Sequence, residues 1–228
     1  MGFLFDHEVS CVSVANDEGL FPVHRIYCVG KNYAEHTREM GGDPAKDTPC
    51  FFSKPPDSVV PDSTVIPFPG STENLHYEVE LVVAIGKEAQ NISPEDALDV
   101  VYGYAVGIDL TRRDLQNEAK AAGRPWEIAK GFDFSAPISA IHQVSEIGHP
   151  KSASIKLSVN GELRQDGNID DMVWNVAEII SELSNYFKLQ AGDLIFTGTP
   201  SGVGKLSEGD KIEARIEGID KLSVSLSN

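Results

Sequence analysis

The stretch His76–Gly86 reads HYEVELVVAIG and places Glu78 and Glu80 inside a run of β-branched and apolar residues. A short run of this kind, bounded by glycine, is typical of a β-strand. Alternate side chains of a strand point to the same face, so the spacing of two residues directs both carboxylates to one face. Two buried like charges repel each other unless a cation compensates them. The stretch therefore indicates either a metal site or, on spacing alone, the solvated face of an edge strand.

A third acidic residue, Asp109, ends the next strand-like run, VYGYAVGID, and precedes a polar helical stretch. It either converges on Glu78 and Glu80 or caps that helix. Three carboxylate oxygens would leave about three positions of an octahedron open, which a Lewis acid needs for substrate and water. All-oxygen ligation favours Mg²⁺ or Mn²⁺ over zinc, with Ca²⁺ as an alternative.

Short strands separated by Gly and Pro recur along the chain, and β-structure is expected to dominate. We expect strands at Arg25–Val29, Glu78–Ile85, Ser154–Val159, Asp193–Phe196 and Lys211–Ile216, and helices at Asn32–Met40, Pro94–Val100, Thr111–Ala122 and Met172–Phe187. Ser93 fits an N-cap before a proline at the first helical position. Because helices and strands do not alternate strictly, we expect a β-rich α+β fold, a mixed β-roll, in place of a doubly wound parallel sheet. The region Gly41–Asp62, rich in Pro, Asp and Gly, predicts a long loop or lid.

The composition bounds the function. The chain has 228 residues, 41% hydrophobic and 24% charged, with a formal net charge of -16. That charge disfavours nucleic acid and anionic membranes as partners. It would also repel an anionic substrate, so a site for one must carry local positive charge. Cys11, Cys28 and Cys50 lack a CxxC spacing and fit free thiols, and without a secretory signal or a long apolar run the expected location is the cytoplasm.

An acid-base pair is indicated in NYAEHTREMGG, where His36 and Glu39 lie three residues apart and would share one face of a helix. A carboxylate hydrogen-bonded to an imidazole fixes its tautomer and raises its basicity, so the pair could deprotonate water near neutral pH. The alternative is an exposed helical ion pair, and Glu35 is a rival partner that points elsewhere on the helix. Gly41 and Gly42 follow directly, as a C-cap and a hinge for lid closure.

Local positive charge is available near these groups. Arg113 and Gln116 lie three apart in TRRDLQ, and Lys130 lies in an otherwise apolar stretch, where an unpaired ammonium would be costly. Arg112 and Arg113 could instead be a solvated pair. The TGTPSGVG run lacks the GxxxxGK[ST] spacing of a phosphate-binding loop, so we expect no nucleotide or organic cofactor.

Five blocks of sequence resemble the fumarylacetoacetate hydrolase family. They are, in order, CVGKNYAEHTREMG, HYEVELVVAIG, GYAVGIDLTRRDLQ, GRPWEIAKGFD and DLIFTGTPSGVG. They span Cys28–Gly204 and are most similar to the single-domain acylpyruvate hydrolase branch. The resemblance implies one catalytic domain over residues 1–228, the mixed β-sandwich roll of the family, a mobile lid at about residues 31–47, and usually a homodimer. It also implies that Glu78, Glu80 and Asp109 hold the metal.

The resemblance further implies hydrolysis of a carbon-carbon bond in an acylpyruvate, a 2,4-diketo acid, with fumarylpyruvate as the best single candidate. The resemblance assigns His36 and Glu39 to activating water, Gln116 and Lys130 to binding the keto acid and its developing enolate, and Thr199 to contacting the substrate carboxylate. Arg113 is a further candidate for binding the substrate. Oxaloacetate decarboxylation and diketo-acid isomerisation are alternatives within the same family. An inactive protein that binds metal or keto acid is the alternative from another class.

Overall fold

A six-stranded sheet positions the acidic residues singled out above: Glu80 lies within one of its strands, and Glu78 and Asp109 lie directly next to strand ends. The computed structural model describes residues 4–6, 8–41, 43 and 49–227. In spatial order the strands of this sheet are β12 (His142–Gln143), β9 (Val101–Ile108), β8 (Val79–Ile85), β15 (Asp193–Phe196), β3 (Arg25–Gly30) and β4 (Cys50–Lys54). Only β15 and β3 run parallel. Because β8 is an interior strand and buried along its whole length, a solvated edge strand is excluded.

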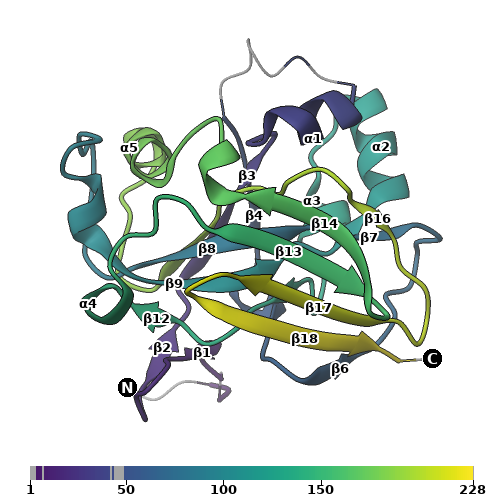
Figure 1. The fold of residues 1–228 in the computed structure, drawn as a ribbon, viewed down its shortest axis with the longest axis horizontal. Coiled ribbons are helices and arrows are strands. Elements are labelled where there is room, and N and C mark those ends of the chain that lie inside the picture. Colours follow the sequence, from purple (N-terminus) through teal and green to yellow (C-terminus); the bar gives the residue numbers. More distant parts are fainter. Residues whose placement is uncertain (1–3, 7, 42, 44–48, 228) are drawn as a thin grey trace.

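A five-stranded sheet packs against the first (Figure 1). Its spatial order is β14 (Glu162–Asn168), β13 (Ser154–Val159), β17 (Lys211–Ile216), β18 (Asp220–Leu226) and β6 (Thr64–Ile66). Along β17 buried and exposed residues alternate, as expected for a sheet with one face on the core and one in water. Between the sheets, Leu81 and Val106 of the first pack with Ile155 and Leu157 of the second in one hydrophobic core.

Shorter elements surround the two sheets. They are the paired strands β1 (Cys11–Ser13) and β2 (Leu20–Pro22), β5 (Val59–Val60) and β11 (Ala136–Pro137), and the trio β10 (Thr111–Arg112), β7 (Leu75–Tyr77) and β16 (Gly204–Lys205). The helices are α1 (Ala34–Glu39), α2 (Arg113–Ala121), α3 (Glu127–Lys130), α4 (Val144–Ile147) and α5 (Val176–Tyr186), with 3-10 turns η1 (Pro56–Ser58), η2 (Ala97–Val100) and η3 (Ile169–Asp171). α1 and α2 both lie at one end of the molecule (Figure 1). Among the described residues, we find no helix with the length and apolar character needed to cross a membrane.

Most of the elements predicted from sequence are confirmed, but three helices begin later than expected. Helix α1 begins at Ala34 and not at Asn32, because Tyr33 forms a β-bridge with Met172. The strands β13, β15 and β17 have the predicted bounds. Helix α2 begins at Arg113 because Thr111 and Arg112 pair with β7. Helix α5 begins at Val176 because Asn175 caps it in a capping box with Glu178. Among the described residues, no disulfide links Cys11, Cys28 and Cys50.

The helix predicted at Pro94–Val100 is wrong. Only the short 3-10 turn η2 forms there, and the Ser93 hydroxyl donates to the Asp96 side chain at 3.1 Å and does not cap a helix. The strand β9 begins at Val101, so the segment has too few residues for a stable α-helix.

The expected long loop at Gly41–Asp62 is also wrong over its second half. There β4 pairs in antiparallel fashion with β3, and β5 pairs with β11. Without β4, the backbone N–H and C=O groups on one side of β3 would have no strand partner. This need arises from residues far apart in the sequence, so local composition does not reveal it. Residues 42 and 44–48, which belong to or border the lid expected at about residues 31–47, lie outside the described residues.

Close packing of Gly107 sets the path of β9 toward Asp109. A Cβ at this position would lie 2.5 Å from Phe196 Cε1 and 2.5 Å from Val82 Cγ2. We therefore expect Gly107→Ala to lower the free energy of unfolding by about 1–3 kcal/mol through overpacking, measured by urea denaturation. Gly70→Ala is the matched control, because no atom lies within 4 Å of its Cβ position, and it should change stability by less than about 0.5 kcal/mol. Equal losses in both variants would contradict this account.

Candidate metal and substrate site

The three carboxylates predicted to hold a metal converge at one end of β8 and β9. Glu78, Glu80 and Asp109 each place one carboxylate oxygen within 4.8 Å of the others, and all three side chains are buried. We call them the acidic trio. The Asp109 backbone N–H donates to the Glu78 carbonyl oxygen at 2.8 Å, which ties the end of β9 to the beginning of β8. Asp109 is therefore a member of the trio and not a helix cap.

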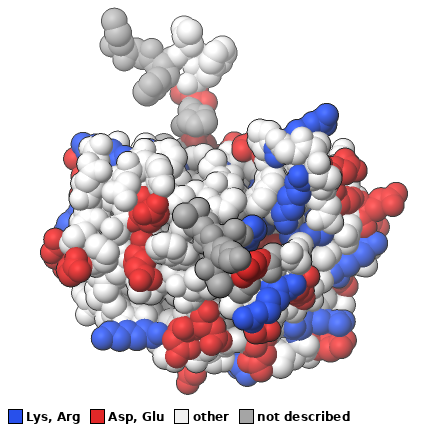
Figure 2. All heavy atoms as spheres, turned by 90° about the horizontal axis from the view of Figure 1, so that it is seen from above, with Lys and Arg blue, Asp and Glu red and all other residues white. Residues whose placement is uncertain are grey.

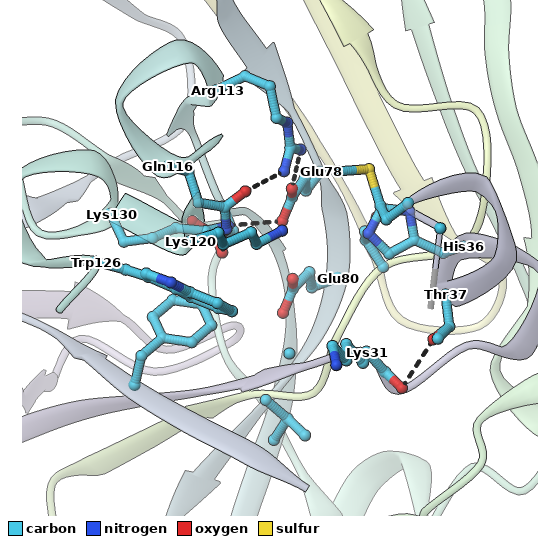
Figure 3. A pocket seen from close by; sticks show the side chains of 17 residues that line it. Lys31, His36, Thr37, Glu78, Glu80, Arg113, Gln116, Lys120, Trp126 and Lys130 are labelled. Atoms are coloured by element: carbon cyan, nitrogen blue, oxygen red, sulfur yellow. Dashed lines mark hydrogen bonds and ion pairs between the residues drawn. The ribbon is translucent and has the colours of Figure 1, made fainter. Parts of the chain in front are cut away.

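Two of the cations predicted from sequence, Lys130 and Arg113, form ion pairs with carboxylates of the trio. Lys130, in α3, donates from Nζ to Glu78 Oε2 at 2.8 Å, to Asp109 Oδ2 at 2.6 Å and to Thr111 Oγ1 at 2.6 Å. All three of its N–H donors are thus used inside the site. Arg113, the first residue of α2, forms an ion pair with Glu78 Oε1 (Figure 3).

The arginine pair suggested by the sequence is split by the fold. Arg113 is buried and also donates to Gln116 Oε1 at 2.6 Å. Arg112 turns the other way, with its guanidinium 4.4 Å from the centre of the Phe132 ring. Arg113 and Gln116 therefore belong to the site, and the alternative of a solvated arginine pair is wrong.

Sequence reasoning missed a third cation, Lys54. It ends β4 with its side chain buried, and its Nζ lies 2.8 Å from Asp109 Oδ1. The expectation of a loop over Gly41–Asp62 concealed it. The available signal was a lysine two positions after the apolar pair Phe51 and Phe52, because an ammonium placed close to core residues requires a buried partner.

The neighbouring cations give Glu78 and Glu80 pKa values that are shifted in opposite directions. Burial raises the pKa of Glu78, but the charges of Lys130 and Arg113 outweigh burial and hold this pKa well below its usual range. Burial, reinforced by the charges of Asp109 and Glu78, raises the pKa of Glu80 well above its usual range. Among the described residues, the one hydrogen bond recorded for the Glu80 carboxylate comes from the Gly198 backbone N–H at 2.8 Å. Among the residues that the structure describes, Glu78 and Asp109 form ion pairs with lysine or arginine, and none is found for Glu80.

The donor set fits a hard divalent cation. The trio offers oxygen ligands alone, in a cluster small enough to share one ion, as Mg²⁺ and Mn²⁺ prefer. Glu78 and Asp109 already contact ammonium or guanidinium groups, whereas Glu80 is the carboxylate whose buried charge remains to be compensated. These three residues could therefore hold Mg²⁺ or Mn²⁺.

The loop after β15 brings backbone and side-chain donors to the trio. Gly198 has φ +99°, and a Cβ there would lie 2.7 Å from the Cβ of Asn32, so this position requires glycine. The Asn32 amide, itself buried, donates to the Thr197 carbonyl at 2.7 Å and to the Trp174 carbonyl at 3.0 Å. The loop is thereby fixed in a position from which Gly198 reaches Glu80.

Thr199 lines the same cavity, held by a residue that sequence reasoning missed. Gln165, fully buried in β14, donates from Nε2 to Thr199 Oγ1 at 2.8 Å and to the Pro200 carbonyl at 2.8 Å. Its Oε1 accepts from the Val79 backbone N–H at 3.0 Å. An isolated glutamine among strand residues gives no local signal, because its partners lie on other elements.

The predicted acid-base pair forms on α1. His36 Nδ1 lies 3.2 Å from Glu39 Oε2, whereas Glu35 pairs with Arg38 at the surface. A carboxylate can only accept, so the hydrogen bond places the proton on Nδ1 and leaves the Nε2 lone pair free. Glu39 also accepts weakly from the Gly202 backbone N–H at 3.3 Å. The His36 ring faces the cavity opposite the trio (Figure 3).

All the predicted site residues except Glu39 line one cavity of about 230 Å³. This volume is at the small end for ligand pockets, which suits a small organic acid. The wall also contains Phe52 and Trp126, together with Lys31 and Lys120. The face that carries α1 and α2 has most of its basic side chains on one half (Figure 2).

The two glutamates should respond in opposite ways to loss of charge. The carboxyl of Glu80 binds its proton more tightly in the folded chain than in the unfolded chain, so metal-free protein loses stability as pH rises above the ordinary carboxyl pKa of about 4.3. We expect Glu80→Gln to raise the melting temperature of metal-free protein at pH 7 and to abolish stabilisation by Mn²⁺. Wild-type protein should gain about 2.7 kcal/mol at a Mn²⁺ concentration of about 100 times Kd.

Glu78→Gln is the matched control. It leaves Lys130 and Arg113 without their shared carboxylate, so the metal-free variant should lose about 3–5 kcal/mol of stability. Calorimetric Mn²⁺ titration and thermal denaturation with and without chelator measure both effects. Wild-type Mn²⁺ affinity in the Glu80 variant would remove that residue from the metal site.

Known proteins resemble this chain in sequence and in fold. A fumarylpyruvate hydrolase of Ralstonia sp. is 44% identical over 184 residues, 81% of this chain and 95% of the relative. The mitochondrial oxaloacetate tautomerase of Homo sapiens is 44% identical over 194 residues, 85% of this chain and 87% of the relative. The crystal structure of fumarylpyruvate hydrolase from Pseudomonas aeruginosa in complex with Mn²⁺ and pyruvate matches with a TM-score of 0.98 and 48% identity, covering 99% of each chain. Residues 25–226 match the family model for the fumarylacetoacetate (FAA) hydrolase C-terminal domain, so this chain belongs to the fumarylacetoacetate hydrolase family.

Proposed function

We propose that this chain hydrolyses a carbon-carbon bond of an acylpyruvate, with fumarylpyruvate, which gives fumarate and pyruvate, as the best single substrate. The observation that carries the proposal is the His36–Glu39 pair, whose imidazole shares one small cavity with the acidic trio. A general base opposite a metal site suits attack of water on a keto acid. The similar Pseudomonas aeruginosa enzyme was solved with Mn²⁺ and pyruvate, which is a product of this reaction class.

His36 begins the reaction as general base. Its Nε2 takes a proton from water, and the water oxygen bonds to the carbonyl carbon distal to the keto acid. The bond from that carbon to the methylene group then breaks, and its electron pair forms the enolate of pyruvate. Return of the proton to the methylene carbon gives pyruvate. The acyl part leaves as a carboxylic acid, which loses its remaining proton to solvent and becomes a carboxylate. Glu39 keeps Nδ1 protonated and stabilises the imidazolium during this transfer.

Charge on the substrate is balanced by the surrounding cations. When bound by the acidic trio, Mg²⁺ or Mn²⁺ would supply Lewis-acid stabilisation of negative charge on substrate oxygens. Lys130 acts through its charge, because its three N–H donors are already used. Gln116 has its Oε1 engaged by Arg113, so its amide NH₂ group is the part that donates to the substrate.

Thr199 binds the substrate carboxylate through its hydroxyl. Gln165 fixes the direction of that hydrogen bond, because its Oε1 accepts from Val79 and its Nε2 therefore faces Thr199. Thr199 Oγ1 accepts from the amide, and its own O–H remains to donate into the cavity. Gln165 is thus a positioning residue for substrate binding.

Oxaloacetate chemistry is the second candidate. The mitochondrial oxaloacetate tautomerase of Homo sapiens has the same identity to this chain, 44%, as the fumarylpyruvate hydrolase of Ralstonia sp.. Tautomerisation or decarboxylation of oxaloacetate uses the same cations and enolate stabilisation but needs no attacking water. Loss of the base that activates water should therefore slow hydrolysis of an acylpyruvate far more than it slows decarboxylation of oxaloacetate.

We expect His36→Ala to lower kcat for acylpyruvate hydrolysis by about 10²–10⁴, the usual effect of removing a general base, with Mn²⁺ affinity nearly unchanged. Any decarboxylation of oxaloacetate should fall much less. The measurement is loss of acylpyruvate absorbance in Mn²⁺, run beside oxaloacetate. Hydrolysis by the variant within a few-fold of wild type would contradict the role of His36. A wild-type protein that turns over oxaloacetate alone would contradict hydrolysis itself.

Two glutamates of α1 provide a matched pair for the same assay. Glu39→Gln removes the carboxylate that orients His36, whereas Glu35→Gln removes one that pairs with Arg38 at the surface. The first should slow hydrolysis by at least about 10-fold, and the second should leave it unchanged, since exposed ion pairs contribute little. Similar rates for the two variants would refute the orienting role of Glu39.

Thr199→Val should raise KM for an acylpyruvate about 10-fold, the loss of one hydrogen bond to a charged group, while kcat changes less. Gln165→Glu should act in the same direction, because its carboxylate would accept the Thr199 proton in place of the substrate. A melting curve checks that each variant is folded, and Gln143→Glu, on the partly exposed strand β12, is the control for an added charge. An unchanged KM in a folded Thr199→Val protein would rule out substrate binding by this hydroxyl.

A further inference from the structure

Lys120 lines the cavity but takes no part in holding the acidic trio. It lies at the C-terminal end of α2, exposed at the mouth, with its Nζ 5.1 Å from the centre of the Trp126 ring. Figure 3 shows the side chain beside Trp126 with the ammonium directed toward the cavity. Within the described part of the chain no ion pair involves Lys120, whereas Lys130 and Arg113 both contact Glu78.

Lys120 brings positive charge to the cavity in excess of the cations that hold the trio. Arg113 and Lys130 contact the carboxylates of the trio, and Lys120 lines the same cavity as a further cation. Partial burial and then the neighbouring charge of Arg113, with smaller effects of Lys130 and Lys31, lower the pKa of Lys120, although Glu78 opposes them. A bound divalent cation would increase the excess. In a chain with a net charge of -16, this local surplus indicates a site for more than one anionic group.

We propose that Lys120, backed by Trp126, forms a subsite for a second carboxylate at the far end of the substrate, so that the chain selects acylpyruvates that are dicarboxylic acids. The inference rests on the proposed acylpyruvate hydrolysis and names the substrate class of that same cavity. The keto-acid end belongs beside the trio and Thr199, which are buried. The distal end then extends toward the mouth, where Lys120 is exposed.

The wall between the two ends suits a planar, unsaturated chain. The rings of Phe52 and Trp126 lie 5.8 Å apart and tilted by 56°, and both line the cavity. Such a wall packs against the flat face of an enoyl group. The contact of Lys120 with Trp126 restrains the ammonium, and a restrained donor loses less conformational entropy when it binds a carboxylate.

Two substrates of equal length test the subsite. Fumarylpyruvate carries the terminal carboxylate, and crotonylpyruvate has a methyl group in its place. We expect Lys120→Met to lower kcat/KM for fumarylpyruvate by about 10–100-fold, mainly through KM, as for loss of a hydrogen bond between charged groups. The value for crotonylpyruvate should fall by no more than about threefold. Lys151→Met, at an exposed position outside the cavity, is the control and should change neither value.

Binding separates the subsite from the reaction. Both compounds are titrated calorimetrically into the Mn²⁺-loaded His36→Ala variant, in which turnover is suppressed. We expect fumarylpyruvate to bind more tightly than crotonylpyruvate. In the double variant with Lys120→Met, this difference in affinity should disappear. Equal losses for the two compounds, or no preference before the change, would overturn the subsite while leaving hydrolysis intact. If wild-type protein hydrolyses neither compound, the proposed function fails, and the titration still decides whether Lys120 binds the distal carboxylate.

Discussion

The burial of three carboxylates at the end of a central strand pair is the constraint on which the rest of this structure depends. Moving such charges out of water is costly unless cations and hydrogen bonds replace the lost hydration. Lys130, Arg113 and Lys54 supply the cations from three elements, α3, α2 and β4. The placement of these elements around β8 and β9 is therefore dictated by charge as well as by apolar packing.

The same constraint makes the three carboxylates unequal, and the inequality is what gives the site its chemistry. Glu78 contacts two cations, and its pKa is held low, whereas Glu80 accepts a backbone N–H and its pKa is raised. A carboxylate cluster neutralised throughout by lysine and arginine would have little affinity for a metal. Leaving Glu80 without a cation preserves a demand for positive charge that Mg²⁺ or Mn²⁺ meets.

Residues without reactive groups position those that have them. Gly198 allows a left-handed turn against Asn32, and Gln165 joins the backbone beside Glu78 to Thr199. Both keep the loop after β15 at a fixed distance from the trio, so that polar donors meet the substrate in set directions. The cations of the cavity also lie at different depths. Lys130 and Arg113 are buried and form ion pairs with the trio, whereas Lys120 is exposed at the mouth.

The sequence by itself determined the strand Val79–Ile85, the proximity of Glu78 and Glu80, and the His36–Glu39 pair, because each depends on residues close together in the sequence. The ordered blocks also identified the family and its β-rich fold. The homodimer, the mobile lid and the cytoplasmic location expected from sequence stay predictions. The tertiary structure alone decided that Lys54 meets Asp109, that Arg113 separates from Arg112, and that Gln165 reaches Val79, 86 positions away. Such contacts satisfy buried polar groups across elements, and no local pattern records which distant partner a fold will bring to them.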